Sequence, residues 1–225
     1  MQWKQTFCAL RRICLDILFP TPFDVHAFEN ISGDRLLNEA LHAPYDHILQ
    51  NLNAEAVFSY RDPLIRNIIR AFKYTGQKEL SLPLGYALYD TVHEDMAYGA
   101  LMHDASPVIL IPIPLSRARL RERTFNQSAL IARELWALLP SGSATLTEDA
   151  LVRVRDTEKQ ALRTSRAERE ENVRGCFAVT DSSRVAGKRV LLIDDVITTG
   201  ATMREARHVL LDAGAQSVRC LAIAH

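Results

Sequence analysis

The C-terminal end of the sequence constrains the fold most, because strand and helix patterns alternate there at short spacing. An apolar run over 189–193 predicts a buried strand, 202–212 predicts a helix closed by Gly214, and 218–224 predicts another strand. A strand, a helix and a strand at this spacing favour a parallel βαβ unit with a right-handed crossover. The fold class that we expect is therefore α/β, with a mainly parallel sheet flanked by helices.

The same patterns predict further elements upstream of this unit. Helices are expected over 2–18, 63–75, 80–93 and 126–139, another may start at Thr157, and strands are expected over 108–114, 147–155 and 173–179. Residues 19–55 show little periodicity and are expected to form an irregular connection. We therefore divide the chain into an N-terminal extension, 1–57, and an α/β domain, 58–225.

Charge and glycine spacing exclude several classes of site. The sequence holds 27 Lys and Arg and 27 Asp and Glu, so its net charge gives no argument for binding nucleic acid or membranes. The nine glycines are spaced too widely for GxGxxG, GxSxG or a GxxxxGK[ST] phosphate loop. Residues 117–123 concentrate four arginines, which indicates either a solvated helix face or a site for a polyanion.

The cysteines predict no metal centre. Cys8, Cys14, Cys176 and Cys220 include no CxxC pair, so we expect reduced, buried thiols. We find no secretory leader pattern and no run of about 18 apolar residues. The expectation is a cytoplasmic protein without a membrane span.

The segment 190–202 carries the chemistry. A buried strand brings Asp194 and Asp195 to its carboxyl end, where open α/β sheets bind their ligands. Small residues and threonines then lead into a helix, whose N-terminus attracts anions, and this pattern predicts a phosphate cradle over 198–202. The two carboxylates would repel a phosphate, so they must contact sugar hydroxyls or a metal ion. The alternative is a capped helix that follows a solvated Asp pair.

This segment closely resembles the fingerprint of type I phosphoribosyltransferases, and three other blocks are similar to the competence protein F (ComF) family. The blocks are 60–63 with Lys73 and Gly76; 112–115 with Arg119, Arg123 and 125–127; and Arg155, Thr157, Gln160, Arg169, Asn172, Val173, Gly175 and Phe177. The resemblance spans 58–225 and implies a type I phosphoribosyltransferase-like fold for that domain.

The sequence departs from that family at two places. The family usually begins with a four-cysteine module similar to a zinc ribbon, whereas this chain has only Cys8 and Cys14 there, at a different spacing, so we expect no zinc. The family usually has Arg-Gly before the Phe-Asn-Gln block, whereas this chain has Arg123 and Thr124. We expect that loop to be less free to adopt positive φ angles.

The resemblance implies a ligand and a role for each matched residue. The ligand is 5-phosphoribosyl 1-diphosphate or a ribonucleotide, with Mg²⁺ carried by the diphosphate. Asp194 and Asp195 would hold the ribose hydroxyls, and Ser116 and Arg117 would lie near the diphosphate. The 5-phosphate would be bound by Val196, Thr198, Thr199, Gly200, Ala201 and Thr202. Lys159, with Arg163 and Arg166, would belong to a mobile catalytic lid over 156–172, although a solvated helix surface remains the alternative.

The sequence leaves two functions open. The first is a phosphoribosyltransferase that uses an unidentified nitrogen nucleophile. The second is a non-catalytic protein of the same fold that acts in competence, contacting DNA-import proteins. Direct single-strand DNA binding ranks last, because Phe125 is the single aromatic residue beside the arginines of 117–123. A homodimer is also left open.

Three substitutions express these expectations. Gly200→Val should block the amide cradle, because a β-branched side chain resists positive φ and fills the space of the anion. Arg→Gln changes in 117–123 should reduce anion affinity and spare folding. Changing both Asp194 and Asp195 to Asn should abolish ligand binding and leave the fold intact, slightly more stable than before.

Overall fold

The computed structural model describes residues 31–44, 46–101, 108–155 and 171–225. The helix expected over 2–18, the possible helix start at Thr157 and the lid residues Lys159, Arg163 and Arg166 therefore lie outside the described residues. Residues 31–225 form one compact unit.

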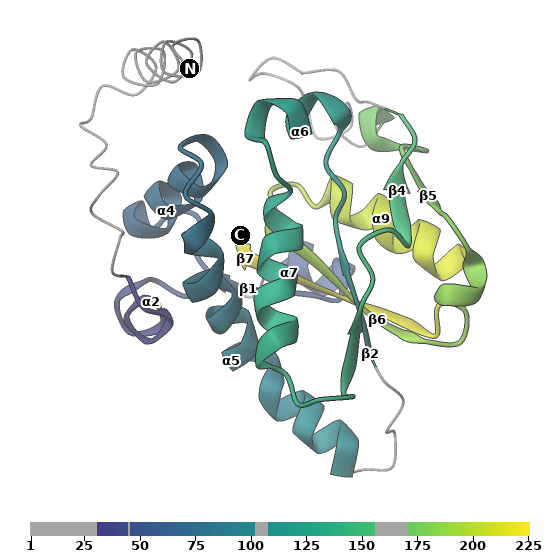
Figure 1. Ribbon diagram of the computed structural model, residues 1–225, viewed down its shortest axis with the longest axis horizontal. Coiled ribbons are helices and arrows are strands. Elements are labelled where there is room, and N and C mark those ends of the chain that lie inside the picture. Colours follow the sequence, from purple (N-terminus) through teal and green to yellow (C-terminus); the bar gives the residue numbers. More distant parts are fainter. Residues whose placement is uncertain (1–30, 45, 102–107, 156–170) are drawn as a thin grey trace, which may run out of the picture. The chain divides into compact units, whose positions relative to one another are not determined.

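A five-stranded parallel sheet forms the centre of this unit, in the order β1-β7-β6-β2-β3 (Figure 1). Its strands are β1 (Ala54–Phe58), β2 (Val108–Pro112), β3 (Ala144–Leu146), β6 (Arg189–Val196) and β7 (Ser217–Ala224). A separate antiparallel pair joins β4 (Leu151–Arg153) to β5 (Phe177–Val179). The predicted fold class is confirmed: β6 and β7 are parallel neighbours joined by one helix.

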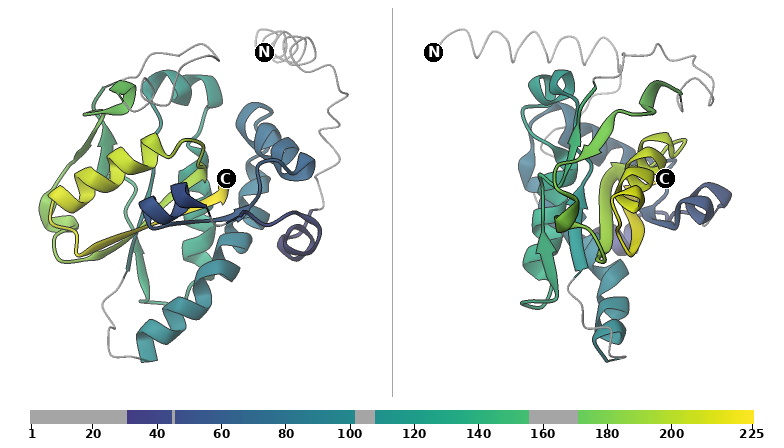
Figure 2. Two further views of the ribbon diagram at one scale, coloured as in Figure 1. Left: turned by 180° about the vertical axis from the view of Figure 1, so that it is seen from behind. Right: turned by 90° about the vertical axis from the view of Figure 1, so that its right-hand side faces the viewer.

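Helices cover both sides of the sheet. Figure 2 shows α7 and α9 on opposite sides of it. The helices are α2 (Gly33–Glu39), α3 (His47–Leu52), α4 (Pro63–Tyr74), α5 (Ser81–Leu101), α6 (Arg117–Arg123), α7 (Gln127–Leu138) and α9 (Ala201–Asp212), with short 3₁₀ turns at Lys78–Leu80 and Ser182–Arg184. The core on the α9 side contains alternate residues of β6, Val190 and Leu192, because successive side chains of a strand point to opposite faces.

Two side-chain caps fix the helices that border the carboxyl edge of the sheet. Asp62 accepts hydrogen bonds from the amides of Leu64 and Ile65 at 2.7 and 3.3 Å, so α4 begins at Pro63, as the sequence predicts. Asn126 accepts from the Ser128 amide at 3.1 Å, and its side-chain nitrogen donates to the carbonyl of Ile113 at 3.0 Å. The second contact ties the start of α7 to the end of β2.

Several predicted boundaries are wrong. Over the described part of 19–55, the chain forms α2 and α3 instead of an irregular connection, and each helix has a side-chain cap, Ser32 and Asp46. The domain boundary that we placed between residues 57 and 58 falls inside β1.

The other boundary errors concern length. The helix expected over 80–93 extends to Leu101, and the strands expected over 147–155 and 173–179 shrink to β4 and β5. The strand expected over 189–193 extends to Val196, so both aspartates lie inside β6.

No helix in the described ranges combines the length and apolarity that crossing a bilayer requires.

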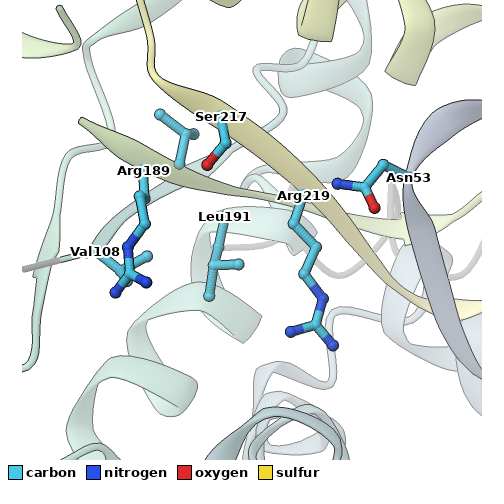
Figure 3. Close-up of a pocket in the computed structure, with 7 residues that line it drawn as sticks. Asn53, Val108, Arg189, Leu191, Ser217 and Arg219 are labelled. Atoms are coloured by element: carbon cyan, nitrogen blue, oxygen red, sulfur yellow. The ribbon is translucent and has the colours of Figure 1, made fainter. Parts of the chain in front are cut away.

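A cavity of about 250 Å³ lies at the amino edge of the sheet (Figure 3). Its lining includes Val108, Arg189 and Ser217, which begin β2, β6 and β7. Arg219, also in the lining, makes an ion pair with Glu55 at 2.7 Å. This cavity lies at the end of β6 opposite to Asp194 and Asp195, so it is separate from the predicted site.

Candidate functional site

Asp195 connects three elements at the carboxyl end of β6. Its Oδ1 lies 2.8 Å from Nζ of Lys73 on α4, and its Oδ2 lies 4.0 Å from Nη1 of Arg123 on α6. The side chains of Lys73, Arg123 and Asp195 are 15%, 10% and 10% exposed. Figure 1 shows α4 and α6 flanking this end of the sheet. One buried carboxylate is therefore the shared counter-ion of two buried cations.

Asp194 has different surroundings from its neighbour. Its Oδ1 accepts hydrogen bonds from the Ser128 hydroxyl and from the backbone N–H of Asp195, both at 2.9 Å. Asp194 is half-buried. Burial, and then the negative charge of Asp195, raise the pKa of Asp194 to about 6, although Lys73 opposes both effects. The two adjacent carboxyl groups are therefore not equivalent: Asp195 is paired with cations, and Asp194 titrates close to neutral pH.

The loop after β6 leads into a helix N-terminus without a side-chain cap. The Ile197 amide donates to the carbonyl of Ala224 at 2.9 Å, which anchors the start of the loop to β7. Gly200 is the N-cap of α9, and no side chain caps the helix. The helix expected over 202–212 begins one residue earlier, at Ala201, and Thr202 lies in its first turn. The first amides of α9 have no intrahelical acceptor and form the kind of terminus that binds anions.

Gly200 is required by its backbone angle and by its neighbours. Its φ is +75°, and a Cβ at this position would lie 2.6 Å from Cδ1 of Leu52 and 3.2 Å from Cγ2 of Ile48. The positive φ that the Gly200→Val prediction assumes is confirmed, but the space that the new side chain would fill belongs to α3 and not to an anion. The new side chain would collide with α3, so the variant would report damaged packing instead of a blocked ligand site.

His225 links α3 to this loop. Its Nδ1 lies 3.0 Å from the carbonyl oxygen of Ile197, and its Nε2 lies 2.8 Å from Oδ2 of Asp46, which caps α3. Both partners are acceptors, so both ring nitrogens must carry a proton for both bonds to form. The hydrogen bond from His225 is the largest cause that lowers the pKa of Asp46. No sequence pattern indicated this contact, because Asp46 and His225 are far apart along the chain.

The arginine-rich segment forms α6, and its members do not share one role. Ser116 is buried and caps the helix by accepting from the Arg119 amide at 3.2 Å, while Arg117, Arg119 and Arg121 are exposed. Arg123 is 9% exposed. Its Nη1 donates to Oε1 of Gln127 at 3.2 Å, and its guanidinium lies 5.7 Å from the centre of the Tyr74 ring. The expectation that the whole run spares folding is therefore wrong for Arg123.

Thr124, between α6 and α7, adopts a backbone conformation that its side chain disfavours. Its φ is +69° and its ψ is −16°, although Thr is β-branched. The sequence predicts that this loop is less free to adopt positive φ, and the loop adopts such an angle nevertheless, at a cost of about 1–3 kcal/mol. The amide of Thr124 donates to the carbonyl of Leu120 at 2.8 Å, so the residue closes α6 as a glycine would.

A Thr124→Gly variant is expected to raise the free energy of unfolding by about 0.5–1 kcal/mol, because Gly adopts this angle without strain. Thermal unfolding should show an increase of a few degrees. Thr75 is a matched control: it also closes a helix, but its φ is −102° and its hydroxyl donates to the carbonyl of Ala71. Thr75→Gly should therefore lower the stability, and an equal response at both positions would contradict the strain at Thr124.

The structure thus assembles part of the predicted site. It places Asp194 and Asp195 directly before the loop that contains Thr198, Thr199 and Gly200, and Ala201 and Thr202 begin α9. Three partners were not assigned a role from sequence: Lys73, Arg123 and Ser128. Lys73 and Arg123 do occur in the blocks that resemble the ComF family, which was the available signal.

The comparisons with known proteins agree with this geometry. The model of the phosphoribosyl transferase domain family matches residues 127–225, which contain α7, β6, α9 and β7. The competence protein ComFC of Bacillus subtilis is 30% identical over 169 residues, 75% of this chain and 62% of that protein. Competence protein F of Haemophilus influenzae is 29% identical over 73% of this chain and 69% of its own length.

A third curated relative covers a similar share. The DNA utilization protein YhgH of Salmonella typhimurium is 30% identical over 166 residues, 73% of this chain and 68% of its own length. Among solved structures, that of the allosteric regulatory enzyme of purine biosynthesis aligns with 55% of this chain and 23% of its own chain, at 25% identity and a TM-score of 0.32.

Four observations now coincide: a parallel sheet in the order β1-β7-β6-β2-β3, two aspartates at the end of its middle strand, an uncapped helix N-terminus after them, and relatives that share about three quarters of the chain. The match to the phosphoribosyl transferase domain covers residues 127–225, which contain the second and the third of these features. The chain belongs to the ComF family and has a type I phosphoribosyltransferase-like fold.

Proposed function

We propose that this protein binds 5-phosphoribosyl 1-diphosphate, or a ribonucleotide, at the carboxyl end of β6. The observation that carries the proposal is the order of groups along the chain: a carboxyl group for which the described residues provide no ion pair, then a loop, then the N-terminus of α9, which has no side-chain cap. The 5-phosphate would accept hydrogen bonds from the amides at the start of α9 and from the Thr198 and Thr199 hydroxyls. The ribose hydroxyls would donate to Asp194.

The proposal divides the roles of the two aspartates. Among the described residues, hydrogen bonds reach only Oδ1 of Asp194, which leaves Oδ2 as an acceptor for a diol. Both oxygens of Asp195 face cations. Asp194 is therefore the primary ribose ligand in this proposal, and Asp195 joins it where its cations are drawn away.

The proposed reaction is transfer of the phosphoribosyl group to a nitrogen nucleophile, with release of diphosphate. Ser116 is the N-cap of α6 and Arg117 is its first residue, so both lie where the loop after β2 would face the diphosphate. Lys159 lies outside the described residues, and its catalytic role on a lid over 156–172 stays part of this proposal.

Mg²⁺ is proposed to enter with the ligand. No group of three or more His, Cys, Asp or Glu side chains in the described ranges is placed to hold a metal ion. The donor set therefore fits an ion carried by diphosphate oxygens, with at most Asp194 added from the protein. Bound there, Mg²⁺ would neutralise the charge that develops on the leaving diphosphate.

A second candidate function is a role in DNA uptake through protein partners, without catalysis. The observation that favours it is the set of printed names of the relatives, which are competence proteins and DNA utilization proteins. This chain spans 62% of the length of the Bacillus subtilis relative, so the activity of that whole protein comes here only as a proposal. Both functions can share one ligand site.

Calorimetric titration with phosphoribosyl diphosphate and Mg²⁺ tests the proposal. We expect saturable binding in the micromolar range, about −8 kcal/mol, that excess sulfate weakens by competing for the start of α9. A screen of nitrogen nucleophiles for diphosphate release then separates the two functions. Release supports the transferase, and binding without release supports the non-catalytic role. Absence of binding would overturn the ligand assignment.

A further inference from the structure

We infer that Lys73 and Arg123 form a diphosphate-recognition subsite whose resting counter-ion is Asp195, so that binding of the diphosphate and binding of the ribose diol are coupled. The inference rests on the proposed function and adds to it a specificity device on α4 and α6, outside the Asp-Asp-Thr-Thr-Gly segment. Four observations carry it: the position of Lys73, the presence of a cation beside each carboxylate oxygen of Asp195, buried donors without acceptors near Arg123, and the backbone strain at Thr124.

Lys73 approaches the site from an element that the fingerprint segment does not contain. It lies in the last turn of α4, its Nζ is 2.8 Å from Oδ1 of Asp195, and its side chain is 15% exposed. A lysine at the surface would keep its ammonium group hydrated, so a buried one needs an anion beside it. Here the anion is Asp195, the residue that directly follows Asp194 at the end of β6.

A carboxylate that serves two cations is a poor acceptor for a diol. Asp195 has Lys73 on one oxygen and Arg123 near the other. A hydroxyl donor would have to compete with the ammonium group of Lys73, whose charge-assisted hydrogen bond is about twice as strong as a neutral one, and with the nearby guanidinium charge of Arg123. Ribose hydroxyls therefore reach Asp195 only when another anion takes over these cations. The diphosphate of the proposed ligand is such an anion, and it belongs to the same molecule as the diol.

Buried hydrogen-bond donors outnumber the acceptors around Arg123 and Gln127. Within the part of the chain that the structure describes, Nε of Arg123 and Nε2 of Gln127 have no hydrogen-bond partner, and Gln127 is fully buried. Gln127 uses its oxygen to accept from Nη1 of Arg123, at 3.2 Å. Buried donors without partners cost free energy, so such a group indicates a site for an acceptor. Arg123 is therefore both one of the two cations beside Asp195 and the bearer of an unsatisfied N–H, and Gln127 beside it has a second free donor, so these groups match an oxyanion with several oxygens.

The loop beside Arg123 holds strain that a movement of α6 could release. Arg123 is the last residue of α6, and Thr124 directly after it has φ of +69°. The Arg123–Asp195 distance of 4.0 Å is longer than a direct hydrogen bond, so this half of the pairing is the weaker one. A short shift of α6 would let Arg123 change its partner from Asp195 to a diphosphate oxygen.

The coupling predicts opposite effects on two ligands. Phosphoribosyl diphosphate carries the diol, the 5-phosphate and the diphosphate, whereas ribose 5-phosphate lacks the diphosphate. Lys73→Gln should weaken the binding of phosphoribosyl diphosphate about tenfold or more, because a charge-assisted contact is lost. The same change should leave ribose 5-phosphate bound as tightly as before, or up to several-fold more tightly, because Asp195 gains an oxygen that can accept from the diol. A purely structural role would weaken both ligands equally.

The experiment is calorimetric titration of the full chain at constant Mg²⁺, with both ligands and four proteins. Lys73→Arg should restore most of the phosphoribosyl diphosphate affinity, since it keeps the charge. Lys188→Gln is the matched control, because Lys188 is exposed at the opposite end of β6 and should change neither affinity. Circular dichroism on each variant establishes that it is folded before titration.

The outcomes separate the two levels of proposal. Opposite or unequal shifts for the two ligands in Lys73→Gln, with recovery in Lys73→Arg, support the subsite. Equal weakening of both ligands, or no change in either, overturns the subsite and leaves the proposed function standing. If the parent protein binds neither ligand, the proposed function fails and the inference fails with it. If Lys73→Gln does not fold, Lys73→Arg and Arg123→Lys give the same comparison with the charges retained. Loss of selectivity for the diphosphate in Arg123→Lys then supports the subsite. Unchanged selectivity in that variant contradicts it.

Discussion

An Asp195→Asn substitution is expected to lower the free energy of unfolding by about 3 kcal/mol, because two buried cations lose their shared counter-ion. Lys73 and Arg123 lie 2.8 and 4.0 Å from the two carboxylate oxygens, and none of the three side chains is more than 15% exposed. Asn keeps the shape and one acceptor oxygen and removes only the charge. For a chain of this size the melting temperature should fall by about 6–12 °C.

Asp194→Asn is expected to change the free energy of unfolding in the opposite direction. Folding raises the pKa of Asp194 from 3.8 to about 6, so the folded state prefers the protonated form. The stability that this preference supplies is fully present below about pH 4 and is lost as the pH rises through about 6. Asn imitates the protonated form at every pH. The variant should therefore match the parent near pH 4 and exceed its stability near pH 8.

Urea unfolding of both variants near pH 4, 6 and 8 measures these effects. A double-mutant cycle with Lys73→Met is the control: the combined Lys73→Met and Asp195→Asn variant should be more stable than the two separate losses predict, by about 1 kcal/mol or more. Equal destabilisation by Asp194→Asn and Asp195→Asn would contradict the division between the two carboxyl groups. The sequence-based prediction that changing both aspartates to Asn leaves the protein slightly more stable assumed that neither carboxylate has a cation partner. Asp195 has two such partners, so we now expect the double variant to lose stability through Asp195.

Local signals predicted the parts of the fold that local physics decides. Asp62 and Pro63 mark the start of α4, and the apolar runs of β2, β6 and β7 mark strands buried on both faces. The strand–helix–strand unit at the C-terminus followed from spacing alone. By contrast, α2 and α3 are short, and too few residues repeat in them for a periodic pattern to stand out.

In the site, too, the sequence predicted neighbours along the chain but not contacts between distant elements. Asp194, Asp195 and the loop after them are contiguous, so the sequence predicted them together. The partner of Asp195 on α4 lies more than a hundred positions away, and nothing in the spacing of Lys73 indicates where its ammonium group goes. Propensity alone does not identify the N-cap of α9: Thr is a good N-cap, but the turn before α9 needs a positive φ, which favours Gly200. Contacts between elements therefore decide the electrostatics of this site.

A Thr199→Asp substitution is expected to weaken binding of phosphoribosyl diphosphate about a hundredfold or more while the fold stays intact. Thr199 is half-buried and directly precedes Gly200, the N-cap of α9. A carboxylate near a helix N-terminus stabilises that helix by about 0.3–1 kcal/mol, so the substitution should not harm folding. The same carboxylate would stand beside the proposed 5-phosphate position, where two like charges about 4 Å apart repel by several kcal/mol at intermediate dielectric.

The strength of this variant is that its effects on stability and on binding have opposite signs, so a loss of affinity cannot be attributed to unfolding. Ser141→Asp is the matched control, because it adds the same charge to an exposed turn just before β3, at the amino edge of the sheet. Calorimetric titration should show near-parent affinity in the control and loss in Thr199→Asp, and thermal unfolding should show both proteins folded. Retained affinity in Thr199→Asp would place the phosphate elsewhere, and the start of α9 would then be an ordinary helix end without a ligand role.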